Sequence, residues 1–257
     1  MSSRPVAVER RFLIGVATAL LGLAAVAWYL TVRQAADMAG MVMGFGQVGV
    51  RMPNEMSGPL FLGMWVVMMV AMMFPTVVPI VSTHLTVSRR KGRGVVPTAV
   101  FVLGYLSVWS AVGLVPMAAF LAFERLTTGA AWLPWLAGAV LIGAGVYQFT
   151  PLKTACLRAC QNPLSFVLTH DWGGGTVAAY RGGAAHGLHC LGCCGALMAV
   201  LLVVGFMNLA WMALLALVFL AEKTWRRGPA LTRAAGTAVA ALGVVVIIEP
   251  AVLRAIT

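Results

Sequence analysis

The stretch HGLHCLGCCGALM, from His186 to Met198, decides how the rest of the chain is interpreted, because it places metal-binding side chains at the head of a long apolar run. On an α-helix, residues three and four positions apart lie on the same face. The histidines and cysteines of the stretch follow this spacing and form one stripe: His186, His189, Cys190, Cys193 and Cys194. The glycines between them fall on the flanks and back, where small residues let another membrane helix approach closely. The stretch therefore predicts a soft-ligand face opposite a packing face.

The composition of the chain indicates a membrane protein. Of its 257 residues, 61% are hydrophobic and only 10% are charged, whereas a soluble domain carries roughly a quarter charged residues. Apolar runs of about 20 residues, the length that crosses a bilayer as a helix, recur along most of the sequence. We expect an all-α, polytopic integral membrane helical bundle, with residues 1–257 forming a single transmembrane domain.

About seven transmembrane helices fit the apolar runs, and six are possible. The predicted spans are 12–32, 59–82, 95–122, 131–150, 186–206, 209–222 and 232–250. The count depends on residues 186–222, which form either two crossings joined by a tight turn at 205–208 or one long, tilted helix. Two connections carry sulfur: a Met-rich outer connection at 33–58 and a Cys/His-containing inner connection at 151–185. In the latter, Thr150 and Pro151 predict the start of a short helix that ends at Asn162-Pro163.

The net charge of +11 is distributed as membrane topology requires. Basic residues gather in short clusters between apolar runs, which is typical of cytoplasmic loops under the positive-inside rule. This pattern places the N-terminus in the cytoplasm. It also favours contact with the lipid bilayer over a nucleic-acid partner.

Thiolate and neutral imidazole are the preferred ligands of copper(I) and zinc. Because one helix presents its ligands along one surface, a second element must complete the coordination. The candidates near the predicted inner face are Cys156, Cys160, His84 and His170. The competing interpretation treats the cysteines as small, inert hydrophobic residues.

A second sulfur pattern lies in the predicted span 59–82. Its methionines repeat every four residues along two adjacent rows: Met64, Met68 and Met72 beside Met69 and Met73. Thioether sulfur is a neutral, soft ligand that suits copper(I) and an oxidising exterior, although methionine also fills irregular cores. Glu222 and Glu249, near the ends of spans, are candidates for groups that support the ligands or carry protons.

The chain resembles the bacterial predicted metal-binding integral membrane protein family, domain of unknown function 2182. The resemblance covers residues 60–225 and rests on WVVMMVAMMFP (65–75), HGLHCLGCCGALM (186–198) and GFMNLAWMALLALVFLAEK (205–223). It implies a multi-helix protein of the bacterial inner membrane with a suspected metal site and no demonstrated activity. The residues of this chain that match the family's motifs are Met68, Met69, Met72, Met73, Cys190, Cys193, Cys194 and Glu222.

These features predict a protein that binds a soft metal ion, copper(I) in the first place and zinc as the alternative, and transports or delivers it. A metallochaperone or a membrane enzyme is the expected protein partner. Two alternatives remain open: a membrane thiol or metal redox protein, and a metal-pinned scaffold or assembly factor for a membrane complex. No catalytic arrangement is recognisable, so we expect a binding protein rather than an enzyme.

Overall fold

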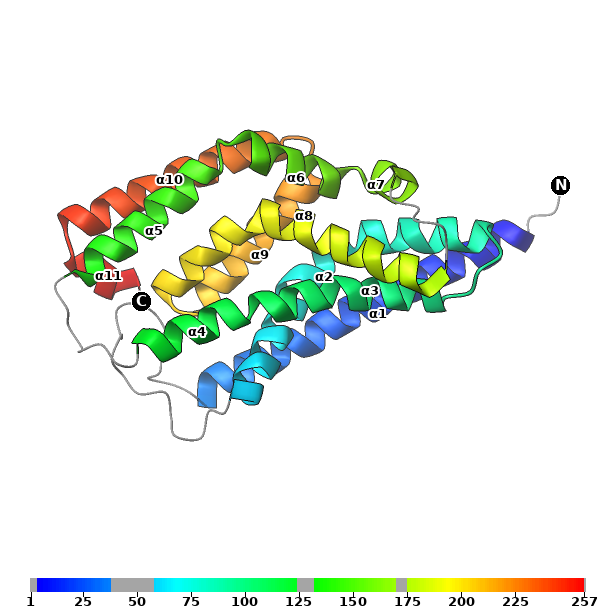
Figure 1. Cartoon of the computed structure of the whole chain (residues 1–257), viewed down its shortest axis with the longest axis horizontal. Helices are drawn as coiled ribbons and strands as arrows, with labels where there is room; N and C mark the ends of the chain where they lie inside the picture. Colours follow the sequence, from blue (N-terminus) through cyan, green and yellow to red (C-terminus); the bar gives the residue numbers. More distant parts are fainter. Residues whose placement is uncertain (1–3, 38–57, 124–131, 170–174, 257) are drawn as a thin grey trace.

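The computed structural model of the chain describes residues 4–37, 58–123, 132–169 and 175–256, and all regular secondary structure in these ranges is α-helical (Figure 1). In chain order the helices are α1 (Arg4–Asp37), α2 (Gly58–Arg90), α3 (Val96–Val112), α4 (Leu114–Phe123), α5 (Leu133–Tyr147), α6 (Pro151–Gln161), α7 (Pro163–Thr169), α8 (Gly175–Val204), α9 (Leu209–Thr224), α10 (Gly228–Ile248) and α11 (Ala251–Ile256). The helical fold class predicted from the apolar runs is confirmed.

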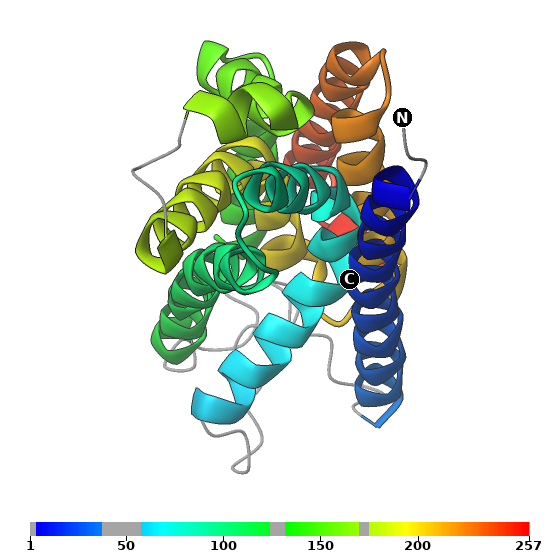
Figure 2. The same cartoon turned by 90° about the vertical axis from the view of Figure 1, so that its right-hand side faces the viewer.

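Three helix pairs make the most extensive contacts in the described structure: α1 with α2, α3 with α8, and α5 with α10. Helix α8 lies at the centre and also contacts α5, α6 and α9. Figures 1 and 2 show the α5–α10 pair on one side of α8 and α9, with α1, α2 and α3 on the other. The core thus forms around the helix that carries the 186–198 stretch.

Within the described residues, five helical segments are long and apolar enough to cross a membrane: 11–36, 58–90, 96–119, 175–204 and 228–248. A sixth is possible if α5 and α6, which are bent by 62° relative to each other, act as one span. Helix α9 has only 16 residues, about 24 Å at 1.5 Å per residue. Seven crossings therefore stay a prediction.

The chain reverses direction between α8 and α9. Helix α8 ends at Val204, and Gly205 adopts a φ of 100°, a left-handed conformation that favours glycine. Asn208 then caps α9, because its side-chain oxygen accepts a hydrogen bond from the Trp211 backbone N–H. The alternative prediction of one long, tilted helix across 186–222 is therefore wrong.

Helix α8 begins eleven residues earlier than its predicted span, at Gly175 rather than His186. The predicted connection 151–185 accordingly consists of α6, α7 and the first turns of α8. Residues 170–174 are not among the described residues. Those first turns are rich in glycine and alanine, a composition that is typical of a connection between spans. In the structure they are helical and pack tightly on α3. Most of the outer connection 33–58 lies outside the described residues, while α1 continues to Asp37.

Close packing of α3 on α8 depends on residues without a Cβ atom. A Cβ added at Gly183 would lie 1.9 Å from the Phe101 carbonyl oxygen, and one added at Gly104 would lie 2.2 Å from the Tyr180 carbonyl oxygen. Both distances are far below van der Waals contact, so any side chain would push the backbones apart. The position of α8, and of everything it carries, depends on these two glycines.

We predict that Gly183→Ala lowers the melting temperature in detergent by about 5 °C or more, because α8 must move away from α3. Gly143→Ala on α5 is the matched control, since a Cβ there meets no atom within 4 Å. Thermal unfolding of the two purified variants checks the prediction. Equal melting temperatures would show that the close approach is unimportant.

Candidate metal centre

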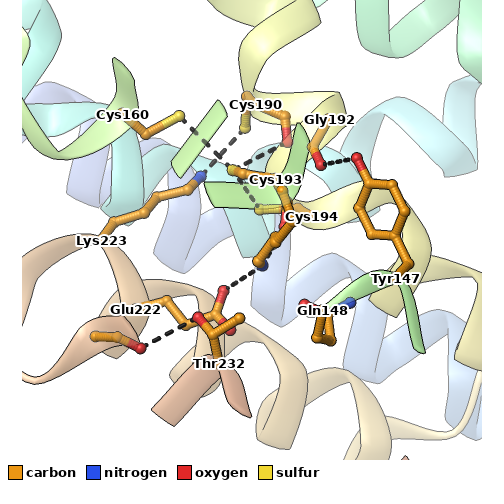
Figure 3. A network of polar contacts seen from close by, with 12 residues as sticks. Tyr147, Gln148, Cys160, Cys190, Gly192, Cys193, Cys194, Glu222, Lys223 and Thr232 are labelled. Atoms are coloured by element: carbon orange, nitrogen blue, oxygen red, sulfur yellow. Dashed lines mark hydrogen bonds and ion pairs between the residues drawn. The ribbon is translucent and has the colours of Figure 1, made fainter. Parts of the chain in front are cut away.

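Four cysteine side chains from two helices meet in the core, and we call Cys160, Cys190, Cys193 and Cys194 the thiol cluster (Figure 3). The three potential ligand atoms on α8, the sulfurs of Cys190, Cys193 and Cys194, all lie within 4.8 Å of one another. Cys160 Sγ on α6 lies 3.6 Å from Cys193 Sγ. The three cysteines of α8 have exposed fractions of at most 1%, and all four are free thiols. The cluster has the donor type and the spacing of a site for a soft metal ion.

Helix α6 begins where the sequence predicts, and this start positions its cysteines beside α8. The Thr150 hydroxyl accepts a hydrogen bond from the Lys153 N–H, which caps α6 directly before Pro151. One turn before Cys160, the Cys156 sulfur would lie only 2.5 Å from a Cβ atom added at Gly192. Cys156 therefore packs on the bare backbone of α8, while Cys160 joins the thiols.

A lysine ammonium group lies beside the thiols. Lys223 Nζ, from the end of α9, donates hydrogen bonds to Cys190 Sγ at 3.1 Å and to Thr76 Oγ1 of α2 at 3.0 Å. The Tyr105 hydroxyl of α3 lies 3.2 Å from the same Cys190 sulfur. Because charge-assisted hydrogen bonds stabilise anions in an apolar interior, this cation stabilises a thiolate at Cys190.

Behind the thiols lies a buried ion pair. Lys153 Nζ is 2.7 Å from Glu222 Oε2, and the two side chains have exposed fractions of 0% and 1%. The same ammonium donates to the backbone carbonyl of Cys193. The Gln161 amide donates to the backbone carbonyl of Glu222 at 2.7 Å. The ion pair thus connects α6, α8 and α9 at the cluster.

The two predicted carboxylates differ in position. Glu222 is buried and takes part in this ion pair, next to the helix that carries the ligands. Glu249 lies at the C-terminal end of α10, where its exposed side chain accepts a hydrogen bond from the Ala251 N–H at 3.4 Å. The contacts of Glu249 are those of a group at a helix boundary.

The described histidines of the predicted set do not join the grouping of α8 cysteines. His186 is buried among Phe101, Tyr105 and Phe166. His189 Nδ1 lies 2.8 Å from the carbonyl oxygen of Ala185. Among the described residues, the grouping of three or more metal-binding side chains contains the three α8 cysteines and no histidine.

His84 on α2 lies 3.0 Å from the Thr98 hydroxyl through its Nδ1 atom and stacks on Phe101, with ring centroids 4.7 Å apart. His170 lies outside the described residues. The helical stripe predicted from spacing is real, but tertiary packing divides it into a thiol part and an aromatic-lined histidine part.

All five predicted methionines of α2 are buried, and they divide between two cores. Met68, Met69, Met72 and Met73 belong to the main core, which also contains the α8 cysteines. Met64 belongs to a separate small core with Phe61 and Met207.

A family model described as PpoB2, copper chaperone, matches residues 62–246, well over half of the chain. The chain belongs to the PpoB2 copper chaperone family. The matched region contains the whole thiol cluster together with Lys153, Glu222 and Lys223. The family supports a metal-binding protein and copper as the metal, and its description does not carry the name of the domain of unknown function that the sequence resembles. No curated protein and no solved structure matches the chain.

Of the charged residues around the thiols, Glu222 was predicted from sequence, but Lys153 and Lys223 were not. Lys223 belongs to a basic cluster at a helix end, and Lys153 lies in a segment interpreted as a connection. The available signal was the Glu222-Lys223 pair directly after an apolar run, which places two charges at the edge of a span. The partners of these charges lie 69 and 33 residues away in the chain, and no local spacing identifies them.

We predict that Glu222→Gln lowers the free energy of unfolding by about 3–5 kcal/mol, because the Lys153 ammonium is left buried without its counter-charge. The double variant Glu222→Gln with Lys153→Met should recover part of the loss. Glu249→Gln, an exposed control, should change it by less than about 0.5 kcal/mol. Denaturant titration in detergent checks the three variants, and similar values for both glutamate variants would contradict the prediction.

Proposed function

We propose that this protein is a membrane-embedded chaperone for copper(I), and that the thiol cluster binds the ion. The observation that carries the proposal is the grouping of three buried cysteine sulfurs within 4.8 Å of one another, in a chain of a copper chaperone family. Thiolate sulfur favours the monovalent ion, since copper(I) is soft and accepts two or three sulfur ligands. The thiolate ligands by themselves would also suit zinc, whereas membership of the copper chaperone family favours copper.

The charges around the thiol cluster also suit a monovalent ion. Lys153 and Glu222 neutralise each other, which leaves the Lys223 ammonium as the cation that contacts a thiol. A copper(I) ion bound by two thiolates carries one negative charge, and Lys223 balances it. A buried site without net charge avoids the large cost of an isolated charge in an apolar interior.

The helices and the distribution of charge support the proposed membrane location. Five or six helical segments of the described residues have the length and apolarity of membrane spans. One end of the bundle carries basic residues: Lys91 and Arg93, after α2, line the same cavity as the start of α8. In Figure 1 the start of α1 lies at this end of the molecule as well. We propose that this end faces the cytoplasm of a bacterium and that α9 completes a seventh crossing.

Delivery, rather than transport, is the activity we propose. The ion would be held inside the bundle and passed to a thiol-bearing metallochaperone or a copper-dependent membrane enzyme. A thiol redox role is less well supported, because an adjacent cysteine pair such as Cys193 and Cys194 forms a strained disulfide. A scaffold role requires that copper stabilises the fold without leaving it.

We predict that Cys193→Ser weakens copper(I) binding at least about 100-fold, because Cys193 is the thiol that joins Cys160 to the α8 pair. Cys156→Ser is the matched control, one helical turn from Cys160 but outside the thiol cluster, and should change the affinity by less than about threefold. Competition with a chromogenic copper(I) chelator, on anaerobic detergent-purified protein, measures both.

Three outcomes would overturn the proposal. They are copper(I) binding by Cys193→Ser equal to that of the natural protein, equal losses in both variants, and a purified protein that retains zinc but no copper. A chaperone gives up its bound copper(I) to an acceptor protein, whereas a scaffold retains it. Copper(I) that a thiol-containing acceptor protein cannot withdraw would therefore indicate a structural ion. In sealed vesicles a chaperone produces no net copper uptake, while accumulation would identify a transporter.

The seven-span topology predicts that the two chain ends lie on opposite sides of the membrane. Green fluorescent protein fused before Met1 should fluoresce in the cytoplasm. Alkaline phosphatase fused after Thr257 should be active outside, because α9 reverses the chain once more. An inactive phosphatase at the C-terminus would instead mean six crossings, with α9 or the α5–α6 pair re-entering on one side.

A further inference from the structure

We propose a second copper(I) site, formed by the thioethers of Met64, Met117 and Met207 and separate from the thiol cluster. We call these residues the methionine triad. The inference rests on the proposed function in one respect, namely that copper(I) is the cargo. It adds a site where the ion binds before it reaches the thiols.

The triad belongs to a small core of its own. Met64 of α2 and Met207 of the 205–208 turn are 8% and 7% exposed, and with Phe61 they form a buried cluster apart from the one that contains the cysteines. Met117 of α4, half-buried, packs against this cluster. Three methionines from elements distant in sequence therefore pack in one small core, near the ends of α2, α4 and α8.

Trp65 fixes these three elements relative to one another. Its Nε1 donates to the Trp109 carbonyl oxygen of α3 at 2.7 Å. Its ring meets Phe206 edge-on, with centroids 5.6 Å apart. A Cβ added at Gly113 would lie 2.5 Å from Trp65 Cδ1, so the ring lies flat against the α3–α4 junction.

Each triad residue lies next to one of these contacts in the chain. Met64 precedes Trp65, Met207 follows Phe206, and Met117 lies one helical turn after Gly113. The Met117 sulfur also lies 3.5 Å from where a Cβ on Gly58 would be, in the first turn of α2. The packing around Trp65 thus brings together the three elements that carry the triad.

The donor chemistry of the triad is specific. Three neutral thioethers bind a soft monovalent ion without releasing a proton, and they have little affinity for zinc. Thioethers do not form disulfides, so the site remains intact on an oxidising side of the membrane. Their binding is weaker than that of thiolates, which favours onward movement of copper(I) to the cysteines.

One face of α2 connects the two sites. From Met64 the residues at four-residue spacing are Met68, Met72 and Thr76, a distance of about 18 Å along the helix. Thr76 Oγ1 accepts a hydrogen bond from Lys223, which also donates to Cys190. The row therefore begins at the triad and ends at the cluster, with two buried thioethers between them.

The test uses a background in which the four cysteines of the thiol cluster are replaced by serine. Silver(I), a redox-inert analogue of copper(I), is titrated into this purified protein and its stoichiometry measured by elemental analysis after desalting. We expect one equivalent in the background and its loss in the added Met64→Leu, Met117→Leu and Met207→Leu triple variant. Leucine conserves volume at low cost to stability.

The matched control replaces Met198 and Met212, two buried methionines outside the triad, by leucine in the same background, and should retain the equivalent. The methionines of residues 38–57 are present in every variant, so an ion held there would survive the triple replacement. Silver(I) that stays bound in the triple leucine variant would overturn the proposal. So would a four-serine protein that binds no silver(I) at all.

The triple leucine replacement in the natural-cysteine protein separates the two proposals. Unchanged copper(I) affinity at the thiols shows that the variant folds and that the proposed function stands whatever happens to the triad. We expect that affinity within about threefold of the natural protein. Loss of thiol binding in this variant would show that the two sites are not separate.

Discussion

The hydrogen bond from the Lys223 ammonium to Cys190 Sγ, 3.1 Å long, is the interaction on which the arrangement of the centre depends. An ammonium group inside an apolar bundle is tolerated only where its hydrogen bonds and its charge are satisfied. Lys223 meets this requirement with a hydroxyl from α2 and a sulfur from α8. The end of α9 is therefore held against both helices, and Lys153 holds α6 against the α8 backbone at Cys193. The helices of the centre are arranged by two buried cations as much as by apolar packing.

Helical periodicity and end signals predicted much of the fold. The apolar runs located α2, α3 and α10, Thr150 and Pro151 marked the start of α6, and Asn208 lies in the predicted turn. The start of α8 was missed because its first turns contain Gly182 and Gly183 instead of an apolar stripe. What makes those turns helical is the neighbouring α3 backbone, which a single sequence does not reveal.

For the centre, the sequence predicted the three α8 cysteines that the structure groups together, and Glu222 beside them, but not the two lysines. Three- and four-residue spacing brought the α8 cysteines together correctly, because that spacing is a property of the helix itself. Cys156 and Cys160 were equivalent by spacing, and their contacts distinguish them: Cys156 packs on Gly192, whereas Cys160 contacts Cys193. His186 shares the cysteine stripe, yet aromatic rings from α3 and α7 surround it. Contacts between helices follow from tertiary packing, and they decide which members of a stripe become neighbours.

The placement of α6, which follows α5 at a 62° bend, has a mechanical consequence for the proposed delivery of copper(I). Three of the four thiols are fixed to one helix, so their spacing cannot change without breaking α8. The fourth depends only on how α6 rests against it. A small displacement of α6 would open the coordination sphere from one side and leave the remaining sulfurs in place. An incoming thiol could then take the vacated position while copper stayed bound, so the ion would pass between proteins by ligand exchange without being released into water.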